Sequence, residues 1–170
     1  AKKLKIRCLI RKKEDAERLE KLGCAIAIGD ITDAKALESA AKGCDAVIHG
    51  AAVIRGTKSE YEKVNVQGTI NAVEAARKAK ARHVIFLSTI LAAYEKTTSY
   101  GKSKLTGEGI IKRSGVPYTI LRLSIAYKEG DDKTIGKLIS LVRELPIVPV
   151  VAGANEKLQP VYSKDVAKAI

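Results

Sequence analysis

The sequence predicts an α/β fold, a Rossmann-like doubly wound parallel sheet, on two observations. Short apolar runs alternate with amphipathic stretches of roughly 9–16 residues along most of the chain. Three of the early and middle stretches run into a glycine, at Gly23, Gly43 and Gly115, the residue that most often closes a helix. Such strand–helix–strand units join parallel strands by right-handed crossovers, so we expect three layers with helices on both faces of the sheet. At 170 residues the chain fits one domain, residues 1–170.

The apolar runs give the expected strands, and the stretches between them give the helices. Leu4–Ile10 alternates apolar and polar residues in the manner of a strand. The later strands are expected at Cys24–Ile28, Asp45–His49, His83–Leu87, Tyr118–Leu123 and Ile147–Val151. The helices are expected at Glu14–Leu22, from an Asp33 cap to about Ala41, at Val66–Ala79, Ser99–Ser114 and Thr134–Glu144, and from Ser163 onward.

Charge and composition exclude several classes of protein. Lysine and arginine number 31 against 19 acidic residues, and this net charge of +12 favours an anionic ligand. Only 4% of residues are aromatic and no zinc-finger spacing is present, so we expect a phosphorylated cofactor and no nucleic-acid partner. No apolar run approaches a membrane span and the charged start is unlike a signal peptide, which predicts a cytoplasmic protein without membrane contact. Cys8, Cys24 and Cys44 lack CxxC spacing, so we expect small buried thiols and no metal site.

In a doubly wound sheet, ligands bind beyond the carboxyl ends of the strands. The residues that follow the expected strands are Arg11, Lys12 and Lys13; Gly29, Asp30 and Ile31; Gly50, Ala51 and Ala52; Ser88 and Thr89; and Ser124, Ile125 and Ala126. Asp30 suits an adenine amino group, with Ile31 over the ring, or else it is a turn and cap residue. The small side chains from Gly50 to Ala52 admit a flat ligand close to the backbone, or else form a tight turn.

Tyr100 and Lys104 lie four residues apart in the expected helix that follows Ser88 and Thr89, and so share one face. A nearby ammonium favours the phenolate, so we expect a lowered pKa for Tyr100 and proton exchange with a substrate hydroxyl or carbonyl. A hydroxyl of Ser88 or Thr89 could hold the substrate oxygen. The spacing alone is weak evidence, because a chain this rich in lysine contains about one such pair by chance. The alternative is a helix surface with a packed tyrosine and a solvated lysine.

Five segments, spread over almost the whole chain, resemble the short-chain dehydrogenase/reductase superfamily in its extended or atypical branch. They are CLIRKKEDAERL, GDITDAKALESAAKGCDAVIHGAA, VNVQGTINAVEAARKAKARHVIFLST, YGKSKLTGEGIIKRSGVPYTILRLS and LQPVYSKDVAKAI. That branch includes NAD-dependent epimerases and dehydratases, NmrA-like proteins and the Rossmann accessory subunit of respiratory complex I. The order and spacing of the segments are far more specific than any one of them.

The resemblance implies that the chain binds NADP or NAD. The residues it assigns to the cofactor are Arg11, Lys12, Asp30, Ile31, Gly50, Ala51, Ala52, Asn65, Lys104, Ser124, Ile125 and Ala126. Asp30 and Ile31 would line the adenine, and Ser124 to Ala126 the nicotinamide end. NAD enzymes usually carry an acidic residue after the strand that comes first here, to bind the adenosine ribose. Arg11 and Lys12 stand there instead and suit a 2′-phosphate, so NADP is favoured.

The resemblance assigns catalysis to Tyr100, Lys104 and Ser88 or Thr89, with Asn65 bracing the site. It implies an NAD(P)-dependent oxidoreductase or epimerase/dehydratase that acts on a hydroxyl or carbonyl carbon of a small molecule, a nucleotide sugar being one class. The alternative is a non-catalytic NADP(H)-binding module of the NmrA-like or complex I kind. A short loop before Tyr100, Ile90 in place of a family Ser or Thr, and Leu123 in place of a family proline favour the atypical branch. Extended members often pair through two helices, here Val66–Ala79 and Ser99–Ser114, so a homodimer is expected.

The family's first strand and its glycine-rich loop have no counterpart in this sequence, which starts at the second strand of the family and stops before the substrate segment. In the strand order of the fold, the first strand is central. We therefore expect a slot between Leu4–Ile10 and Asp45–His49, with unpaired backbone groups on both sides. The prediction is that the sequence is a fragment or that another strand fills the slot.

Overall fold

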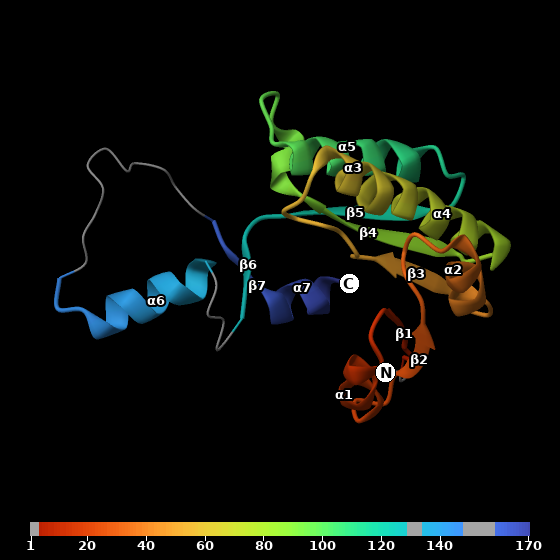
Figure 1. Ribbon diagram of the computed structural model, residues 1–170, viewed down its shortest axis with the longest axis horizontal. Helices are drawn as coiled ribbons and strands as arrows, with labels where there is room; N and C mark the ends of the chain where they lie inside the picture. Colours follow the sequence, from red (N-terminus) through yellow and green to blue (C-terminus); the bar gives the residue numbers. More distant parts are fainter. Residues whose placement is uncertain (1–3, 129–133, 148–158) are drawn as a thin grey trace. The chain divides into compact units, whose positions relative to one another are not determined.

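A computed structural model describes residues 4–128, 134–147 and 159–170 (Figure 1). The chain divides into two compact units, Ala1–Arg122 and Leu123–Ile170, which are described one at a time. The expectation of one domain over residues 1–170 remains a prediction.

The strands of the first unit form two separate sheets. Strand β1 (Arg7–Ile10) pairs in parallel with β2 (Ala25–Ile28), with Cys8 level with Ile26. The other sheet has the order β3 (Ala46–His49), β4 (His83–Thr89), β5 (Tyr118–Leu123), and β3 runs parallel to β4. Among the described strands none pairs with the inner edge of β1 or of β3. The expectation that the first and third strands are not direct neighbours is confirmed.

The helices of the first unit follow the predicted order, with differences at Glu14–Leu22 and before Val66 and with an additional 3₁₀ turn at Ile90–Ala93, in the segment expected to be a loop. They are η1 (Lys13–Asp15), α1 (Ala16–Glu20), α2 (Ala34–Ala41), α3 (Lys58–Glu60), η2 (Tyr61–Gln67), α4 (Gly68–Lys78), η3 (Ile90–Ala93) and α5 (Ser99–Lys112). The helix expected at Glu14–Leu22 is shorter, because a 3₁₀ turn precedes α1. The helix expected from Val66 starts at Lys58 and passes through the π-helix η2 before it becomes α4. Gly23, Gly43 and Gly115 all have positive φ, as expected of residues that close helices.

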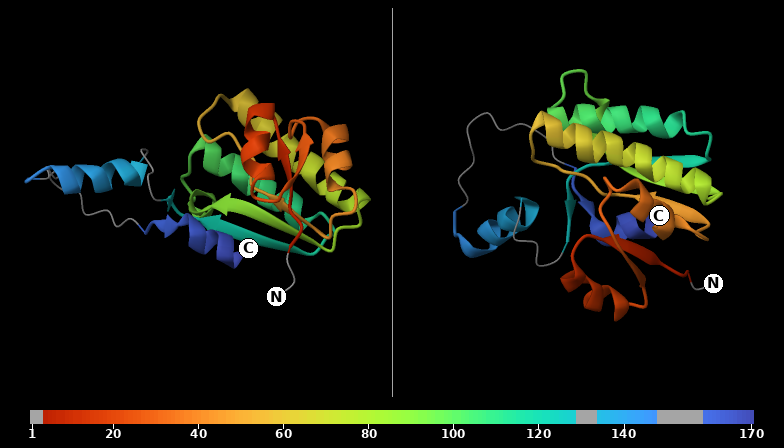
Figure 2. Two further views of the ribbon diagram at one scale, coloured as in Figure 1. Left: turned by 90° about the horizontal axis from the view of Figure 1, so that it is seen from below. Right: turned by 45° about the vertical axis from the view of Figure 1, so that its right-hand side comes forward.

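Helices α4 and α5 lie on one face of the β3–β4–β5 sheet (Figure 2). The core between them and the sheet includes Val84, Phe86 and Ile111, all with no exposed surface. Gly107 of α5 permits the close approach, because a Cβ there would lie 2.8 Å from Cζ of Phe86. A smaller apolar cluster between α2 and α4 is built around Leu37. These contacts place one face of α5 directly over β4.

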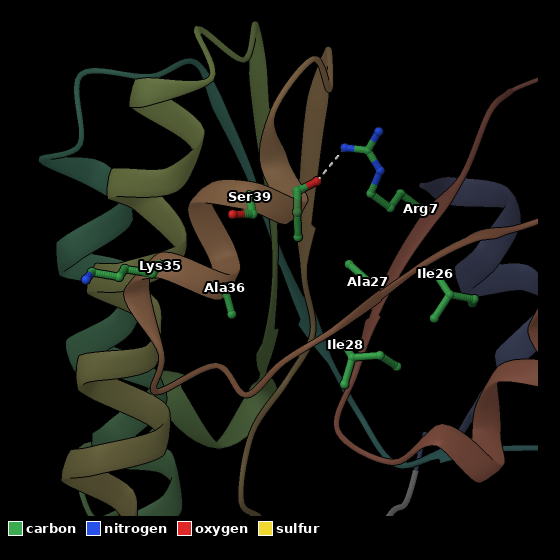
Figure 3. A pocket seen from close by; sticks show the side chains of 8 residues that line it. Arg7, Ile26, Ala27, Ile28, Lys35, Ala36 and Ser39 are labelled. Atoms are coloured by element: carbon green, nitrogen blue, oxygen red, sulfur yellow. Dashed lines mark hydrogen bonds between the residues drawn. The ribbon is translucent and has the colours of Figure 1, made fainter.

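Arg7 of β1 ties the first sheet to α2. Its Nη1 donates to the carbonyl oxygens of Ala40 (2.7 Å) and Lys42 (2.8 Å) and lies 3.6 Å from Sγ of Cys44. These are carbonyls at the end of α2, where a cation is favourable. Figure 3 shows Arg7 beside the small cavity of about 480 Å³ between β2 and α2. The three cysteines are free thiols and half-buried, more accessible than expected.

The second unit contains β6 (Ala126–Tyr127), α6 (Thr134–Glu144), β7 (Val161–Tyr162) and α7 (Ser163–Ala169). Strands β6 and β7 pair in parallel. Both helices start where the sequence predicts them. The strand expected at Ile147–Val151 lies, apart from Ile147, outside the described residues.

Candidate functional site

A cavity of about 930 Å³ lies between β1 and β3 in the first unit. Its lining includes the ends of both strands and the loops that follow them. The predicted cofactor residues that line it are Arg11, Lys12, Asp30, Ile31, Gly50, Ala51 and Ala52. The fold therefore brings together seven of the predicted cofactor residues, although they come from three separate segments of the chain.

Asp30 shapes the turn that follows β2, which is one of the two roles considered for it. Its Oδ1 accepts hydrogen bonds from the backbone N–H of Thr32 (2.8 Å) and from the Thr32 hydroxyl (2.7 Å). These bonds, with a smaller contribution from the Arg11 guanidinium, lower the pKa of Asp30 below its ordinary value. Its Oδ2 lies 3.8 Å from Nη1 of Arg11, whose side chain is 74% exposed. One oxygen thus shapes the turn, and the other remains open to a ligand donor.

The cavity residues suit the adenosine part of NAD(P)H. They offer a carboxylate to accept from an amino group, an apolar side chain to cover a ring, and two cations to meet a phosphate. The start of α2 is a different case, because the Asp33 carboxylate already accepts from the amides of Lys35 and Ala36. That helix start is therefore capped by the chain itself.

Asn65, which is only 2% exposed, joins the loop after β3 to α5. Its Oδ1 accepts from the Val53 amide (2.8 Å), and its Nδ2 donates to the Val53 carbonyl and to the Ser103 hydroxyl, both at 2.9 Å. The Ser103 hydroxyl in turn donates to the carbonyl oxygen of Tyr100 (2.7 Å). Asn65 lies within the π-helix η2, a rare geometry that is frequent at functional sites.

His49, at the end of β3, was missed as a candidate. It is 3% exposed, and burial lowers its pKa to about 3, so the ring is neutral at physiological pH. Its Nε2 lies 2.9 Å from the hydroxyl of Thr69, which donates to the Asn65 carbonyl (2.6 Å). Because that hydroxyl proton is used, Nε2 of His49 carries the ring proton. A polar residue closing the apolar run DAVIH is the only sequence sign of this network.

Tyr100 and Lys104 lie one turn apart on α5, but their electrostatics differ from expectation. Lys104 is 2% exposed, its Nζ lies 3.9 Å from the centroid of the Phe86 ring, and burial lowers its pKa to about 8. Tyr100 is half-buried, and burial raises its pKa, with a smaller effect of Tyr61, whose ring centroid lies 6.5 Å away. The prediction of a lowered pKa for Tyr100 is wrong, because desolvation of the phenolate outweighs any attraction to the ammonium.

The hydroxyls of Ser88 and Thr89 are already engaged. Ser88 donates to Oε1 of Glu108 (2.6 Å), and Oγ1 of Thr89 accepts from the Leu91 amide (3.3 Å). Within the described residues no hydrogen bond joins either hydroxyl to the hydroxyl of Tyr100. No role was predicted for Glu108, although its spacing of four residues from Lys104 places it on the same face of α5.

Glu108 is 1% exposed and is held by the guanidinium of Arg122 in β5. Nε of Arg122 donates to Oε1 (2.8 Å) and Nη2 donates to Oε2 (2.7 Å). The hydrogen bonds from Arg122 lower the pKa of Glu108, against the opposing effect of burial. The buried carboxylate is therefore ionised and fixed in orientation.

The three residues expected at the nicotinamide end belong to the second unit. The Ser124 hydroxyl donates to the Gln159 carbonyl, the Ile125 carbonyl accepts from the Val161 amide (3.0 Å), and Ala126 opens β6. Their contact with a cofactor remains a prediction. Among the helices of the described residues, none has the length and apolarity to cross a membrane.

Known proteins resemble the chain in sequence and in fold. The family model described as NAD(P)H-binding matches residues 1–144. The ceramide reductase of Caulobacter vibrioides is 31% identical over 143 residues, which are 84% of this chain and 44% of that protein. The photosystem II assembly factor Ycf39 of Trieres chinensis is 25% identical over 163 residues, 96% of this chain and 50% of that protein. The chain thus spans about half the length of these relatives.

A solved structure shows the same fold. The Bordetella bronchiseptica enzyme WbmG, in complex with NAD and UDP, superposes with a TM-score of 0.67 at 25% identity, over 86% of this chain and 52% of that one. The family match spans the sheet, the cavity between β1 and β3, and the helix that carries Tyr100 and Lys104. The chain belongs to the NAD(P)H-binding family, within the extended or atypical branch of the short-chain dehydrogenases/reductases.

Proposed function

We propose that the protein is an NAD(P)-dependent oxidoreductase or epimerase that acts on a carbon bearing a hydroxyl or carbonyl group. The observation that carries the proposal is Lys104, a lysine buried to 2% exposure one helical turn from a half-buried Tyr100. Burying an ammonium costs free energy, and such a cost is typical of functional sites. The bound nicotinamide would supply or accept the hydride.

Tyr100 is the proposed proton donor and acceptor. Because burial raises its pKa, the phenol is protonated at neutral pH and is suited to donate a proton to a carbonyl oxygen. Thr89 is the better candidate than Ser88 to hold the substrate oxygen, because the Ser88 proton is given to Glu108. Lys104 would hold the nicotinamide ribose, and Asn65 would keep the loop after β3 against α5.

The direct test is Tyr100→Phe, assayed for turnover with NADPH against a panel of ketones, with binding of NADPH measured in parallel. We expect a loss of turnover with NADPH binding retained. Tyr94→Phe, which changes an exposed tyrosine outside α5, is the matched control and should keep the rate. An unchanged turnover in Tyr100→Phe would end the assignment.

The cofactor preference is proposed to be NADP(H), with Arg11 and Lys12 at the 2′-phosphate. The Arg11 side chain is 74% exposed at the mouth of the cavity and has only a long ion pair with Asp30. The double variant Arg11→Ala/Lys12→Ala should weaken NADPH binding at least tenfold and leave NADH binding within about twofold. Lys13→Ala, next in the chain but absent from the cavity lining, is the control. Equal weakening of both cofactors would contradict the assignment.

The proposed substrate is a small hydroxyl or carbonyl compound, and two classes deserve the first assays. The relation to a ceramide reductase supports a ceramide-like lipid. The likeness to an enzyme crystallised with NAD and UDP supports a nucleotide sugar. Turnover of one panel and not the other decides between them.

A non-catalytic NADP(H)-binding module is the second proposal. It is supported by the lack of a hydrogen bond between Tyr100 and Ser88 or Thr89 in the described residues, and by the relation to an assembly factor. Tight NADPH binding without hydride exchange in both substrate panels would favour it over the enzyme. The homodimer through the region of α4 and α5 also remains a prediction, to be checked by sedimentation.

A further inference from the structure

Lys104 is buried, and its direct contacts offset only part of the free-energy cost of burying its ammonium. Its ammonium lies over the Phe86 ring, 3.9 Å from the centroid, a contact that is favourable but weaker than an ion pair. In the described residues no ion pair within 4.0 Å involves Lys104. A cation at 2% exposure nevertheless needs a negative charge nearby to remain ionised.

Glu108 is the acidic group placed to supply that charge. It lies four residues after Lys104 on α5, the spacing at which two side chains share a face. Both residues face the sheet over β4, where Lys104 covers Phe86 and Glu108 binds Ser88, two residues further along the strand. The attraction of Glu108 is the one influence that raises the pKa of Lys104 against its burial.

The orientation of Glu108 is fixed by Arg122 and Ser88. Arg122 holds both carboxylate oxygens from β5, and Ser88 binds one of them from β4. A charge at a fixed distance acts without reorganisation when a ligand arrives. A carboxylate released from Arg122 would instead be free to turn toward the ammonium.

We propose that Glu108 is the fixed counter-charge of Lys104, a positioning residue, and that Arg122 and Ser88 act on the site only through Glu108. The importance of this interaction for turnover rests on the proposed function. The electrostatic interaction between Glu108 and Lys104 does not depend on that function, and it can be measured without a known substrate. The ionisable groups that act on Lys104 are Glu108 on α5 and neutral His49 on β3. One step further out, Tyr61 of η2 lies beside Tyr100, and Arg122 of β5 binds Glu108.

The test is an NMR titration of the Lys104 side chain in the full chain labelled with [¹³C,¹⁵N]-lysine, with the signal assigned from Lys104→Met. Glu108→Gln keeps the shape and removes the negative charge, so the midpoint of Lys104 should fall by about one pH unit or more. Arg122→Gln removes a competing positive charge, so the midpoint should rise. If the substitutions only loosened α5, the Lys104 midpoint would shift in the same direction in both variants, and that result would overturn the proposal.

Two further variants complete the design. Glu17→Gln breaks an exposed Lys–Glu pair of the same i,i+4 spacing on α1, and it should leave the Lys104 midpoint unchanged. If a single variant fails to fold, Glu108→Gln/Arg122→Gln leaves an uncharged, hydrogen-bonded pair, and the midpoint should still lie below that of the wild type. An unchanged midpoint in this double variant would contradict the proposal. Loss of turnover plays no part in the titration, so failure of the proposed enzyme activity would be seen separately.

Discussion

Replacing Lys104 by methionine should stabilise the protein at neutral pH. Burial lowers the pKa of Lys104 from its ordinary 10.5 to about 8. Since each pH unit corresponds to about 1.36 kcal/mol, the folded state at pH 7 bears a cost of about 3 kcal/mol for holding this charge. Methionine fills a similar volume, contacts the Phe86 ring favourably and carries no charge. We expect Lys104→Met to raise the free energy of unfolding by about 1–3 kcal/mol.

The pH dependence of that gain has a definite sign. Between pH 8 and 10.5 the unfolded chain binds more protons at Lys104 than the folded chain does. The wild type therefore gains stability relative to Lys104→Met as the pH rises through this window, and the difference between them shrinks. Urea unfolding at pH 7 and pH 10 measures both quantities. Lys102→Met, an exposed lysine on the same helix, is the control and should show no such trend.

Two results would refute this reasoning. A Lys104→Met variant less stable than the wild type at pH 7 would mean that the ammonium makes a favourable net contribution to folding. A gain in stability that is equal at pH 7 and pH 10 would mean that packing, and not charge, is responsible. Either result would also remove the argument that this lysine is retained for function at the expense of stability.

Three further predictions concern residues around the site. Gly107→Ala should lower stability by about 1–3 kcal/mol, because its Cβ would lie 2.8 Å from Cζ of Phe86. Gly109→Ala should raise stability by up to about 1 kcal/mol, because its Cβ would meet only the flexible side chain of Arg113. Thermal melts compare the two variants. His49 should not titrate above pH 4 by NMR. Since the unfolded chain binds this proton near pH 6.5, the free energy of unfolding should fall as the pH drops from 6.5 toward 3, and a substitution of His49 should remove that fall. Asn65→Ala should lower the free energy of unfolding in urea by about 2–4 kcal/mol, because it leaves the backbone N–H and carbonyl of Val53 unpaired. A loss under about 1 kcal/mol would mean that water replaces the side-chain amide.

The sequence was sufficient for the elements whose pattern is local. Apolar runs marked the strands, the Asp33 cap and the closing glycines marked helix ends, and the segment order marked the family. The π-helix was not predicted, because Val66 starts a regular 3.6-residue pattern while the turn before it is set by Asn65 reaching back to the loop after β3. The hydrogen bonds of the Asn65 side chain join residues 12 positions apart, so they produce no repeating pattern in the sequence.

Electrostatics was the weakest part of the prediction, for a related reason. The spacing of Tyr100 and Lys104 is visible in the sequence, but the burial that raises one pKa and lowers the other comes from the elements that pack against α5, including η2 beside Tyr100 and β4 beneath Lys104. Likewise, Ser88 donates to Glu108, and Glu108 is held in turn by Arg122, which lies 14 residues away in the sequence. Residue types indicated candidates along the chain without showing which atoms their side chains would contact.

The unjoined edges of β1 and β3 have a consequence for how the protein responds to ligand. The β1–β2 ribbon is fastened to the rest of its unit through α2 and Arg7, so it should open in local fluctuations well before the β3–β4–β5 sheet does. A dinucleotide that contacts the ends of both sheets would bind only when β1 and β3 are both in place, so its binding would oppose the opening of the β1–β2 ribbon. Amide hydrogen exchange in β1 and β2 should then slow on adding cofactor, far more than exchange in β4.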